Sequence, residues 1–248
     1  MPRQARLKSK SGIYHIMLRG INQQVIFEDD EDFEKFKEKL ETYKAISEYK
    51  IFAYCLMPNH VHLLIKIEKE DLDLIIKRIA GSYVYWYNWK YYRKGHLFQD
   101  RFKSEPVEDE QYLLTVIRYI HQNPYKAKMV QNIDEYKYSS YNEYKNASDG
   151  ITDIDFVMSL MDKEAFIKYN NEKNSDECLD NEEKEFRLSD PDAKKVIYQV
   201  SKCRNIMDFQ ELETQQRNEY VKELKRKGLS IRQISRLTGV SFAIVRRM

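Results

Sequence analysis

The stretch MPNHVHLL, residues 57–64, places two histidines one residue apart in a run that is otherwise largely apolar. Pro58 and Asn59 are typical turn residues, so the pattern predicts a turn followed by a strand over 60–67. On a strand, His60 and His62 leave one face while Val61 points to the opposite, core side. Two imidazoles on one face make half of a metal site if a third ligand comes from another element. An isolated pair is more often the polar face of a sheet, so the motif alone does not establish a metal site.

Segments on both sides of this motif alternate between strand and helix patterns. Pro124 is expected to end the last helix, because the residue before a proline avoids helical backbone angles. The order β-α-β-β-α-β-α matches the split βαβ arrangement. The sequence therefore predicts an α+β protein with a ferredoxin-like antiparallel sheet, helices on one face, and a small all-α region at the carboxyl end. Strands are expected over 12–20, 49–57, 60–67 and 101–107, and helices over 28–46, 71–93 and 109–123.

The predicted helix over 109–123 carries two polar side chains that bear on the histidines. Tyr119 and Asn123 are four residues apart and therefore share one helix face. The Asn123 carbonyl oxygen suits a third ligand, and the Tyr119 phenol suits a nucleophile beside it. A phenol has a pKa of about 10 and attacks poorly at neutral pH, so it needs a divalent metal that polarises its target. The alternative for Tyr119 is an ordinary half-buried helix residue, one of 19 tyrosines in the chain.

The carboxyl-terminal sequence KGLSIRQISRLTGVSFAIVRRM, residues 227–248, has a helix-turn-helix pattern. Gly239 supplies the turn between two short helices, and the second helix of such a motif enters the major groove of DNA. Arg232, Arg246 and Arg247 are the candidate DNA contacts. The alternative is a helical hairpin that packs on the rest of the protein and carries surface arginines.

Charge divides the chain although the net charge is only +2. Residues 149–185 contain 12 acidic and 4 basic side chains, whereas residues 215–248 contain 9 basic and 2 acidic ones. A basic terminus beyond an acidic stretch is typical of a separate nucleic-acid-binding region. We therefore expect a first domain over 1–147, an acidic linker and cap over 148–192, and a helical DNA-binding region over 193–248.

Composition argues against several classes of protein. No apolar run reaches the length that a membrane helix needs, and no secretory signal follows the basic start of the chain. The three cysteines are scattered without a C-x-x-C pair, which argues against a disulfide scaffold or a structural zinc site. We expect a cytoplasmic protein that does not bind membranes.

Four motifs together resemble the IS200-type transposase superfamily, the single-tyrosine HUH nucleases. The resemblance is strongest to the REP-associated tyrosine transposase-like branch and covers about residues 1–145. The motifs that carry it are GIYHIMLRG (12–20), YCLMPNHVHLL (54–64), GHLFQDRFKS (95–104) and IRYIHQNPYKA (117–127).

The resemblance implies a role for each of the polar residues already named. His60 and His62 become metal ligands, Tyr119 the nucleophile, and Asn123 a further metal-facing residue. Insertion-sequence members typically have glutamine at the last position, and asparagine followed by proline fits the REP-associated branch. The implied reaction is Mg²⁺- or Mn²⁺-dependent cleavage and rejoining of single-stranded, hairpin-containing DNA through a 5′-phosphotyrosine intermediate. A monomer and a homodimer are equally compatible with the sequence.

Basic and aromatic residues near the motifs are candidate DNA contacts. Arg19, Arg101 and Lys103 are expected to contact phosphates, although charged residues at a sheet border need no such role. The stretch SYVYWYNWKYY (82–92) suits stacking of unpaired bases where its rings are exposed. Two other functions stay open: a non-catalytic, sequence-specific DNA-binding regulator with the same fold, and an RNA-binding protein. Retention of both histidines, the tyrosine and the asparagine favours catalysis.

Overall fold

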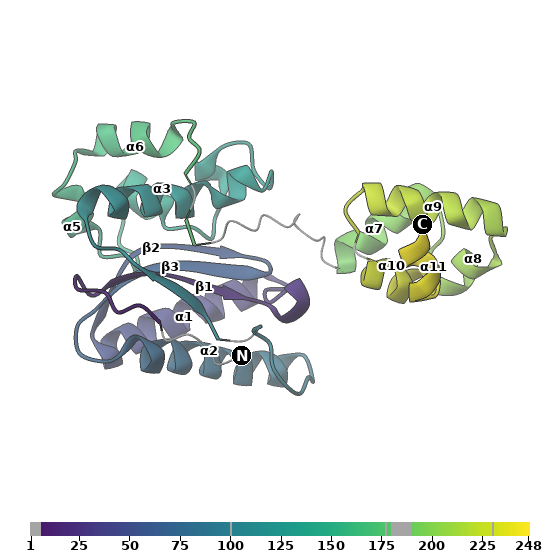
Figure 1. Ribbon diagram of the computed structural model, residues 1–248, viewed down its shortest axis with the longest axis horizontal. Coiled ribbons are helices and arrows are strands. Elements are labelled where there is room, and N and C mark those ends of the chain that lie inside the picture. Colours follow the sequence, from purple (N-terminus) through teal and green to yellow (C-terminus); the bar gives the residue numbers. More distant parts are fainter. Residues whose placement is uncertain (1–5, 100, 177, 180–189, 230) are drawn as a thin grey trace. The chain divides into compact units, whose positions relative to one another are not determined.

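The computed structural model describes residues 6–99, 101–176, 178–179, 190–229 and 231–248. The chain forms two compact units, Met1–Glu182 and Glu183–Met248, and Figure 1 shows both. Each unit has its own hydrophobic core. Among the described helices, none combines the length and the apolar character needed to cross a bilayer.

The first unit is built on a four-stranded sheet with the order β2-β3-β1-β4, in which all neighbours are antiparallel. Two helices, α1 (Asp30–Ser47) and α2 (Leu72–Lys90), connect the strands. This is the predicted ferredoxin-like order, and the fold class is confirmed. The strands are β1 (Ile13–Arg19), β2 (Tyr49–Met57), β3 (His60–Ile67) and β4 (Lys103–Pro106).

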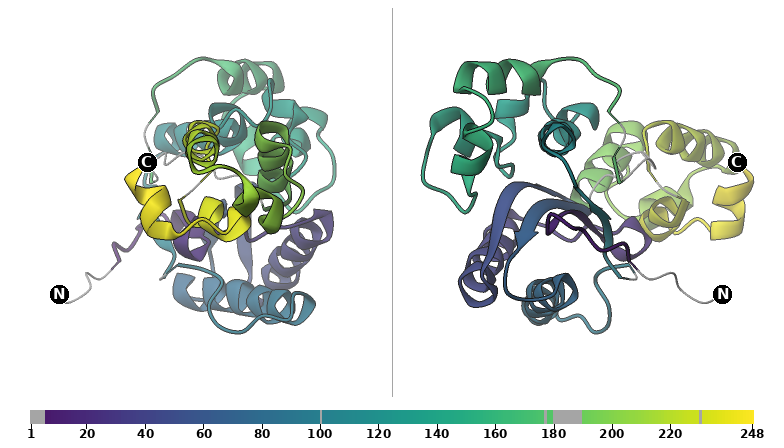
Figure 2. Two further views of the ribbon diagram at one scale, coloured as in Figure 1. Left: turned by 90° about the vertical axis from the view of Figure 1, so that its right-hand side faces the viewer. Right: turned by 60° about the vertical axis from the view of Figure 1, so that its left-hand side comes forward.

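The two faces of the sheet are covered by different helices (Figures 1 and 2). Helices α1 and α2 lie on one face, as predicted, and α3 (Glu110–Lys126) lies across the other. Cross-strand pairs on the α1–α2 side are apolar: Ile16 lies opposite Leu63, and Leu18 opposite Val61. Val61 is fully buried, as the alternation of side chains along a strand predicts. The other face of the same strands is therefore left for the polar side chains.

Helix α3 runs further than the sequence predicted. Asp109 begins it by accepting a hydrogen bond from the Tyr112 backbone N–H at 2.7 Å. The prediction that Pro124 ends the helix is wrong, because the helix continues to Lys126. A proline in the last turn removes a single N–H, and the N–H groups of Ala127 and Met129 complete that turn with hydrogen bonds of 2.9 Å. Tyr119 and Asn123 consequently lie on one uninterrupted helix.

Short helices and an extended segment complete the first unit around α3. In the stretch predicted as an acidic linker and cap, Val157 and Phe166 are buried in the core of this unit. After Phe166, the chain runs along α3, where Arg118 pairs with Asp176 at 2.8 Å. The remaining elements are η1 (Ile21–Gln23), η2 (Ile133–Glu135), α4 (Tyr141–Asn146), α5 (Ile154–Met158) and α6 (Lys163–Asn171).

All the secondary-structure elements described in the second unit are helices. Its last two helices have the predicted helix-turn-helix connection, in which Gly239 adopts a φ of +74°. A Cβ atom there would lie 2.8 Å from the side chain of Ile206, so the turn requires glycine. The helices are α7 (Asp190–Ser201), α8 (Ile206–Glu211), α9 (Thr214–Arg226), α10 (Ile231–Thr238) and α11 (Phe242–Arg247).

Candidate active site

The strand register collects polar side chains on the sheet face beneath α3. His60 lies opposite Arg19, and His62 lies opposite Met17 on β1. Met17 in turn lies opposite Lys103 on β4. Paired residues and alternate residues of a strand share one face, so both histidines and both basic side chains leave the sheet on the same side. Three strands far apart in the sequence therefore contribute to one surface.

His60 and His62 approach each other as the H-x-H spacing predicts. Their ring centroids are 5.0 Å apart, with the planes at 86°. The Nδ1–H of His60 donates to the side-chain oxygen of Asn59 at 2.6 Å, which leaves the His60 lone pair on Nε2. Burial lowers the pKa of His62 well below its ordinary value, and the nearby His60, His15 and Arg19 lower it further. His62 is therefore neutral at pH 7, the state in which an imidazole binds a metal.

Tyr119 lies directly against the histidines. Its ring centroid is 5.8 Å from that of His62, and the two rings meet edge to face. The residue is 7% exposed. The Nζ atom of Lys126, two turns further along α3, lies 5.4 Å from the centroid of the Tyr119 ring. A tyrosine, two imidazoles and a cation thus follow one another in a series of contacts beneath the helix.

Two buried polar atoms, one on β3 and one on α3, have no hydrogen-bond partner among the residues that the structure describes. They are Nε2 of His62 and Nδ2 of Asn123. Asn123 lies one helical turn after Tyr119, and His62 contacts the Tyr119 ring. Buried polar atoms are nearly always satisfied, so each of these two atoms indicates a missing partner. The two ends of an amide are assigned from their contacts, so the Asn123 oxygen can equally occupy the inner position.

The donor set fits a divalent metal. Within the described part of the chain, no three His, Cys, Asp or Glu side chains gather as a metal cluster. A third protein ligand beside His60 and His62 therefore comes from another class, and the amide of Asn123 is the candidate on α3. Two imidazoles and a carbonyl oxygen suit Mn²⁺ and, less closely, Mg²⁺.

Sequence reasoning missed a hydrogen-bonded chain behind His62. Nε2 of His15 lies 3.1 Å from Nδ1 of His62, and Nδ1 of His15 lies 2.9 Å from Oε1 of Glu105. Burial alone would raise the pKa of Glu105, but hydrogen bonds from His15 and Tyr112 lower it overall. The only sequence signal was that His15 alternates with Arg19 on one face of a strand. The pairing with β3 and β4 was needed to reveal the contact.

The other predicted DNA-binding residues of the first unit are on β1, before β4 and at its start. Arg19 is half-buried on the histidine face, and Arg101 and Lys103 are exposed at and before the start of β4. The aromatic stretch on α2 divides between core and surface. Tyr83 and Tyr87 are buried, while Tyr85, Trp89 and Tyr92 are 80%, 72% and 98% exposed.

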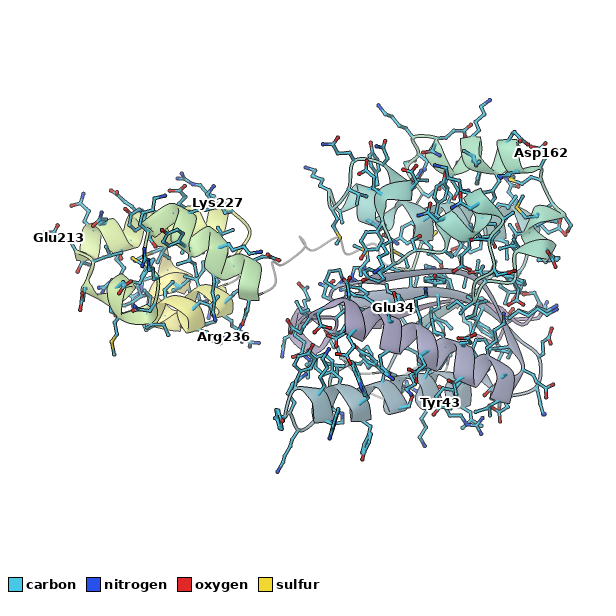
Figure 3. The ribbon with its side chains drawn as sticks, turned by 180° about the vertical axis from the view of Figure 1, so that it is seen from behind. Glu34, Tyr43, Asp162, Glu213, Lys227 and Arg236 are labelled. Atoms are coloured by element: carbon cyan, nitrogen blue, oxygen red, sulfur yellow. The ribbon has the colours of Figure 1, made fainter. Side chains whose placement is uncertain are left out.

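The predicted arginines of the second unit are all exposed. Arg232 lies on α10, and Arg246 and Arg247 lie on α11, where Val245 is the one buried residue. None of the three arginines has an ion-pair partner within the described residues. In contrast, Arg236 of α10, labelled in Figure 3, pairs with Asp190 of α7 at 2.6 Å.

Comparison with known proteins agrees with this geometry. Residues 8–123 match the family described as Transposase IS200 like. The span contains both histidines, Tyr119 and Asn123. That match lies wholly within the first unit, and the helices of the second unit lie outside it.

Two proteins that are similar to the first unit carry a more specific name. A REP-associated tyrosine transposase of Haemophilus influenzae is 29% identical over 114 residues, which cover 40% of this chain and 64% of that protein. The solved structure of a REP-associated tyrosine transposase bound to a REP hairpin superimposes with a TM-score of 0.53 and 16% identity. That superposition covers 62% of this chain and 96% of the other, and it supports the fold.

Proposed function

We propose that the first unit is a transposase domain that cleaves single-stranded DNA beside a hairpin and rejoins it through Tyr119. The observation that carries this proposal is the Tyr119 ring 5.8 Å from the ring of His62, whose buried Nε2 atom has no partner within the described part of the chain. His60, His62 and Asn123 would hold a Mg²⁺ or Mn²⁺ ion. When bound, such an ion polarises a phosphodiester and stabilises the charge that develops on it.

The protein's own residues would perform the transfer. The phenol oxygen of Tyr119 attacks the scissile phosphorus and gives up its proton, while the bond to the 3′ oxygen breaks and that oxygen takes up a proton. The DNA stays attached as a 5′-phosphotyrosine, and the energy of the phosphodiester is conserved. A second 3′-hydroxyl can therefore reverse the step and join strands without ATP.

Basic side chains on α3, on β1 and at the start of β4 suit a polyanionic substrate. Lys126 sets a positive charge beside the Tyr119 ring, where negative charge develops during attack. Arg19, Arg101 and Lys103 are proposed to bind the phosphates on either side of the scissile bond. Hairpin DNA is the substrate class that fits these roles and the family. A cytoplasmic location stays a prediction.

The decisive experiment measures a covalent protein–DNA adduct. End-labelled DNA hairpins with single-stranded flanks are incubated with the full chain and Mn²⁺, and the products are separated on a denaturing gel. We expect a labelled protein band that disappears in Tyr119→Phe. Tyr125→Phe is the matched control, because Tyr125 lies on the same helix with its side chain at the surface. An adduct that survives in Tyr119→Phe contradicts the proposal. No adduct with any hairpin would favour a non-catalytic DNA-binding regulator.

We further propose that the second unit binds duplex DNA through α11. The observation that favours this role is a terminal helix that is exposed apart from Val245 and carries Arg246 and Arg247. The side-chain oxygen of Ser241 caps this helix by accepting from the Ile244 N–H. Arg232 on α10 would contact the backbone, as the first helix of such a motif does.

This role is tested by charge removal in the full chain. The double variant Arg246→Ala and Arg247→Ala should bind a duplex library at least about tenfold more weakly at constant salt. The control removes the same charge from α7, where Lys194 and Lys195 are exposed. Equal losses in both double variants would point to general electrostatics and would contradict a recognition helix.

A further inference from the structure

We infer that His15 and Glu105 are positioning residues that hold His62 in the tautomer and orientation needed to bind a metal. The inference rests on the proposed metal site and adds residues that do not themselves touch the ion. It starts from the continuous chain Glu105–His15–His62, with contacts of 2.9 and 3.1 Å. His15 and His62 are both fully buried. Water therefore does not compete for these hydrogen bonds.

The directions of the hydrogen bonds follow from Glu105. An ionised carboxylate only accepts, so Nδ1 of His15 carries the proton and donates to Glu105. With His15 in the neutral form, its lone pair is on Nε2 and accepts from Nδ1–H of His62. That assignment leaves the His62 lone pair on Nε2, the atom that is buried without a partner. The Glu105 carboxylate thereby determines, through His15, which ring nitrogen of His62 carries the proton.

Glu105 is itself held in place. Its Oε1 atom accepts from the Tyr112 hydroxyl at 2.9 Å and from the Leu179 backbone N–H at 3.2 Å. Tyr112 belongs to α3, the helix that carries Tyr119, and Leu179 belongs to the segment that runs along it. The same contacts therefore connect Glu105 to α3, the helix that carries Tyr119.

His60 reaches the same tautomer by a different device. Its Nδ1–H donates to the side-chain oxygen of Asn59, the preceding residue, at 2.6 Å. Both histidines thus have Nδ1 engaged by a protein acceptor, which places the lone pair of each ring on Nε2. Metal-binding histidines commonly use their second nitrogen in this way, and loss of the outer partner lowers metal affinity about 10- to 100-fold. Asn59 and His15 thus favour the same tautomer in two neighbouring histidines, which incidental packing in a core would not require.

The first test needs no metal. The chain has five histidines, so ¹⁵N-histidine labelling gives a short set of imidazole signals that His60→Gln and His62→Gln assign. We expect His62 to be the Nδ1–H tautomer in the metal-free protein. In His15→Phe, which keeps a ring and loses both nitrogens, we expect the Nε2–H tautomer to appear. A wild-type His62 in the Nε2–H form overturns the inference.

The second test measures Mn²⁺ affinity by titration calorimetry on the full chain. His15→Phe should bind Mn²⁺ about 10- to 100-fold more weakly. His15→Gln, whose amide oxygen can accept from His62, should recover part of that loss. The matched control is His121→Gln. His121 is equally buried but does not belong to the Glu105–His15–His62 series, so this variant should bind Mn²⁺ as the wild type does. Thermal melts establish that each variant is folded.

The outcomes separate this inference from the proposed function. If Mn²⁺ binding depends on His62 but is unchanged in folded His15→Phe, the positioning role alone is overturned. If binding does not depend on His62, the metal site and the positioning role are overturned together. Loss in His15→Phe with recovery in His15→Gln supports the role, because a packing defect alone would not be repaired by an amide.

Discussion

The surroundings of His62 and His121 differ in one decisive way. Both side chains are fully buried, His62 on the sheet beneath α3 and His121 on α3 itself. Burial lowers both pKa values, that of His121 to about 4. Both also have Nδ1 beside a hydrogen-bond partner. Nδ1 of His62 lies 3.1 Å from Nε2 of His15, and Nδ1–H of His121 donates to the Asn170 side-chain oxygen at 2.9 Å.

The second ring nitrogen separates the two sites. Nε2 of His121 lies 2.8 Å from the Ser140 hydroxyl, which can donate to it. Nε2 of His62 has no such partner among the described residues. Burial and a depressed pKa are therefore shared by a core histidine and a candidate ligand. An unsatisfied lone pair, aimed at a tyrosine, is the property that distinguishes function from packing.

The largest expected difference between the two sites concerns cleavage. His62→Gln should reduce formation of the protein–DNA adduct by about a thousandfold or more, because loss of a ligand removes several kcal/mol of transition-state stabilisation. His121→Gln should stay within about threefold of the wild type once corrected for the folded fraction. Rates of adduct formation in excess hairpin DNA measure both. Similar losses in the two variants would abolish the distinction.

A second expected difference concerns acid stability and belongs to the satisfied site. The pKa of His121 is about 4 in the folded protein against 6.5 ordinarily. The unfolded chain therefore binds the proton more tightly, so the stabilisation is complete above pH 6.5 and is lost as the pH falls toward 4. The loss amounts to about 3 kcal/mol for this group. Urea unfolding between pH 7 and 4.5 should show a shallower decline in His121→Gln. Parallel declines would assign the acid sensitivity to other groups.

The smallest expected effect compares the outer partners of the two histidines. Ser140→Ala removes the partner of His121 and should cost about 1–3 kcal/mol of stability without changing Mn²⁺ affinity. Tyr112→Phe removes one donor to Glu105 and should cost about 1 kcal/mol, with a several-fold loss of Mn²⁺ affinity. Calorimetry and urea unfolding on the same samples provide both values. A change of metal affinity in Ser140→Ala would break the comparison.

Local patterns were sufficient to predict the strands and the three long helices of the first unit. Alternating apolar residues and turn residues are short-range signals, and the order of elements limits the sheet to few topologies. The end of α3 was mispredicted, because a proline in a final turn costs little when later N–H groups replace its donor. The H-x-H face also followed from strand geometry alone. Helices α5 and α6 could not be placed from the sequence, because local composition does not reveal the core on which they pack.

The partners of His62 were beyond local patterns. His15 and Glu105 are 90 residues apart and meet only because β4 pairs with β1 in one register. A shift of one residue in that register would turn Glu105 to the opposite face. Hydrogen-bond directions then follow from a carboxylate that can only accept. None of these relations is visible in a window of sequence.

The sequence by itself determined the α+β order, the shared face of His60 and His62, and the shared helix face of Tyr119 and Asn123. Each depends on the period of a strand or a helix, which extends over only a few residues. Tertiary structure decided that these faces meet, that Nε2 of His62 is left without a partner, and that Glu105 and His15 stand behind it. Long-range pairing of strands sets these contacts, and it depends on the whole sheet and its cores.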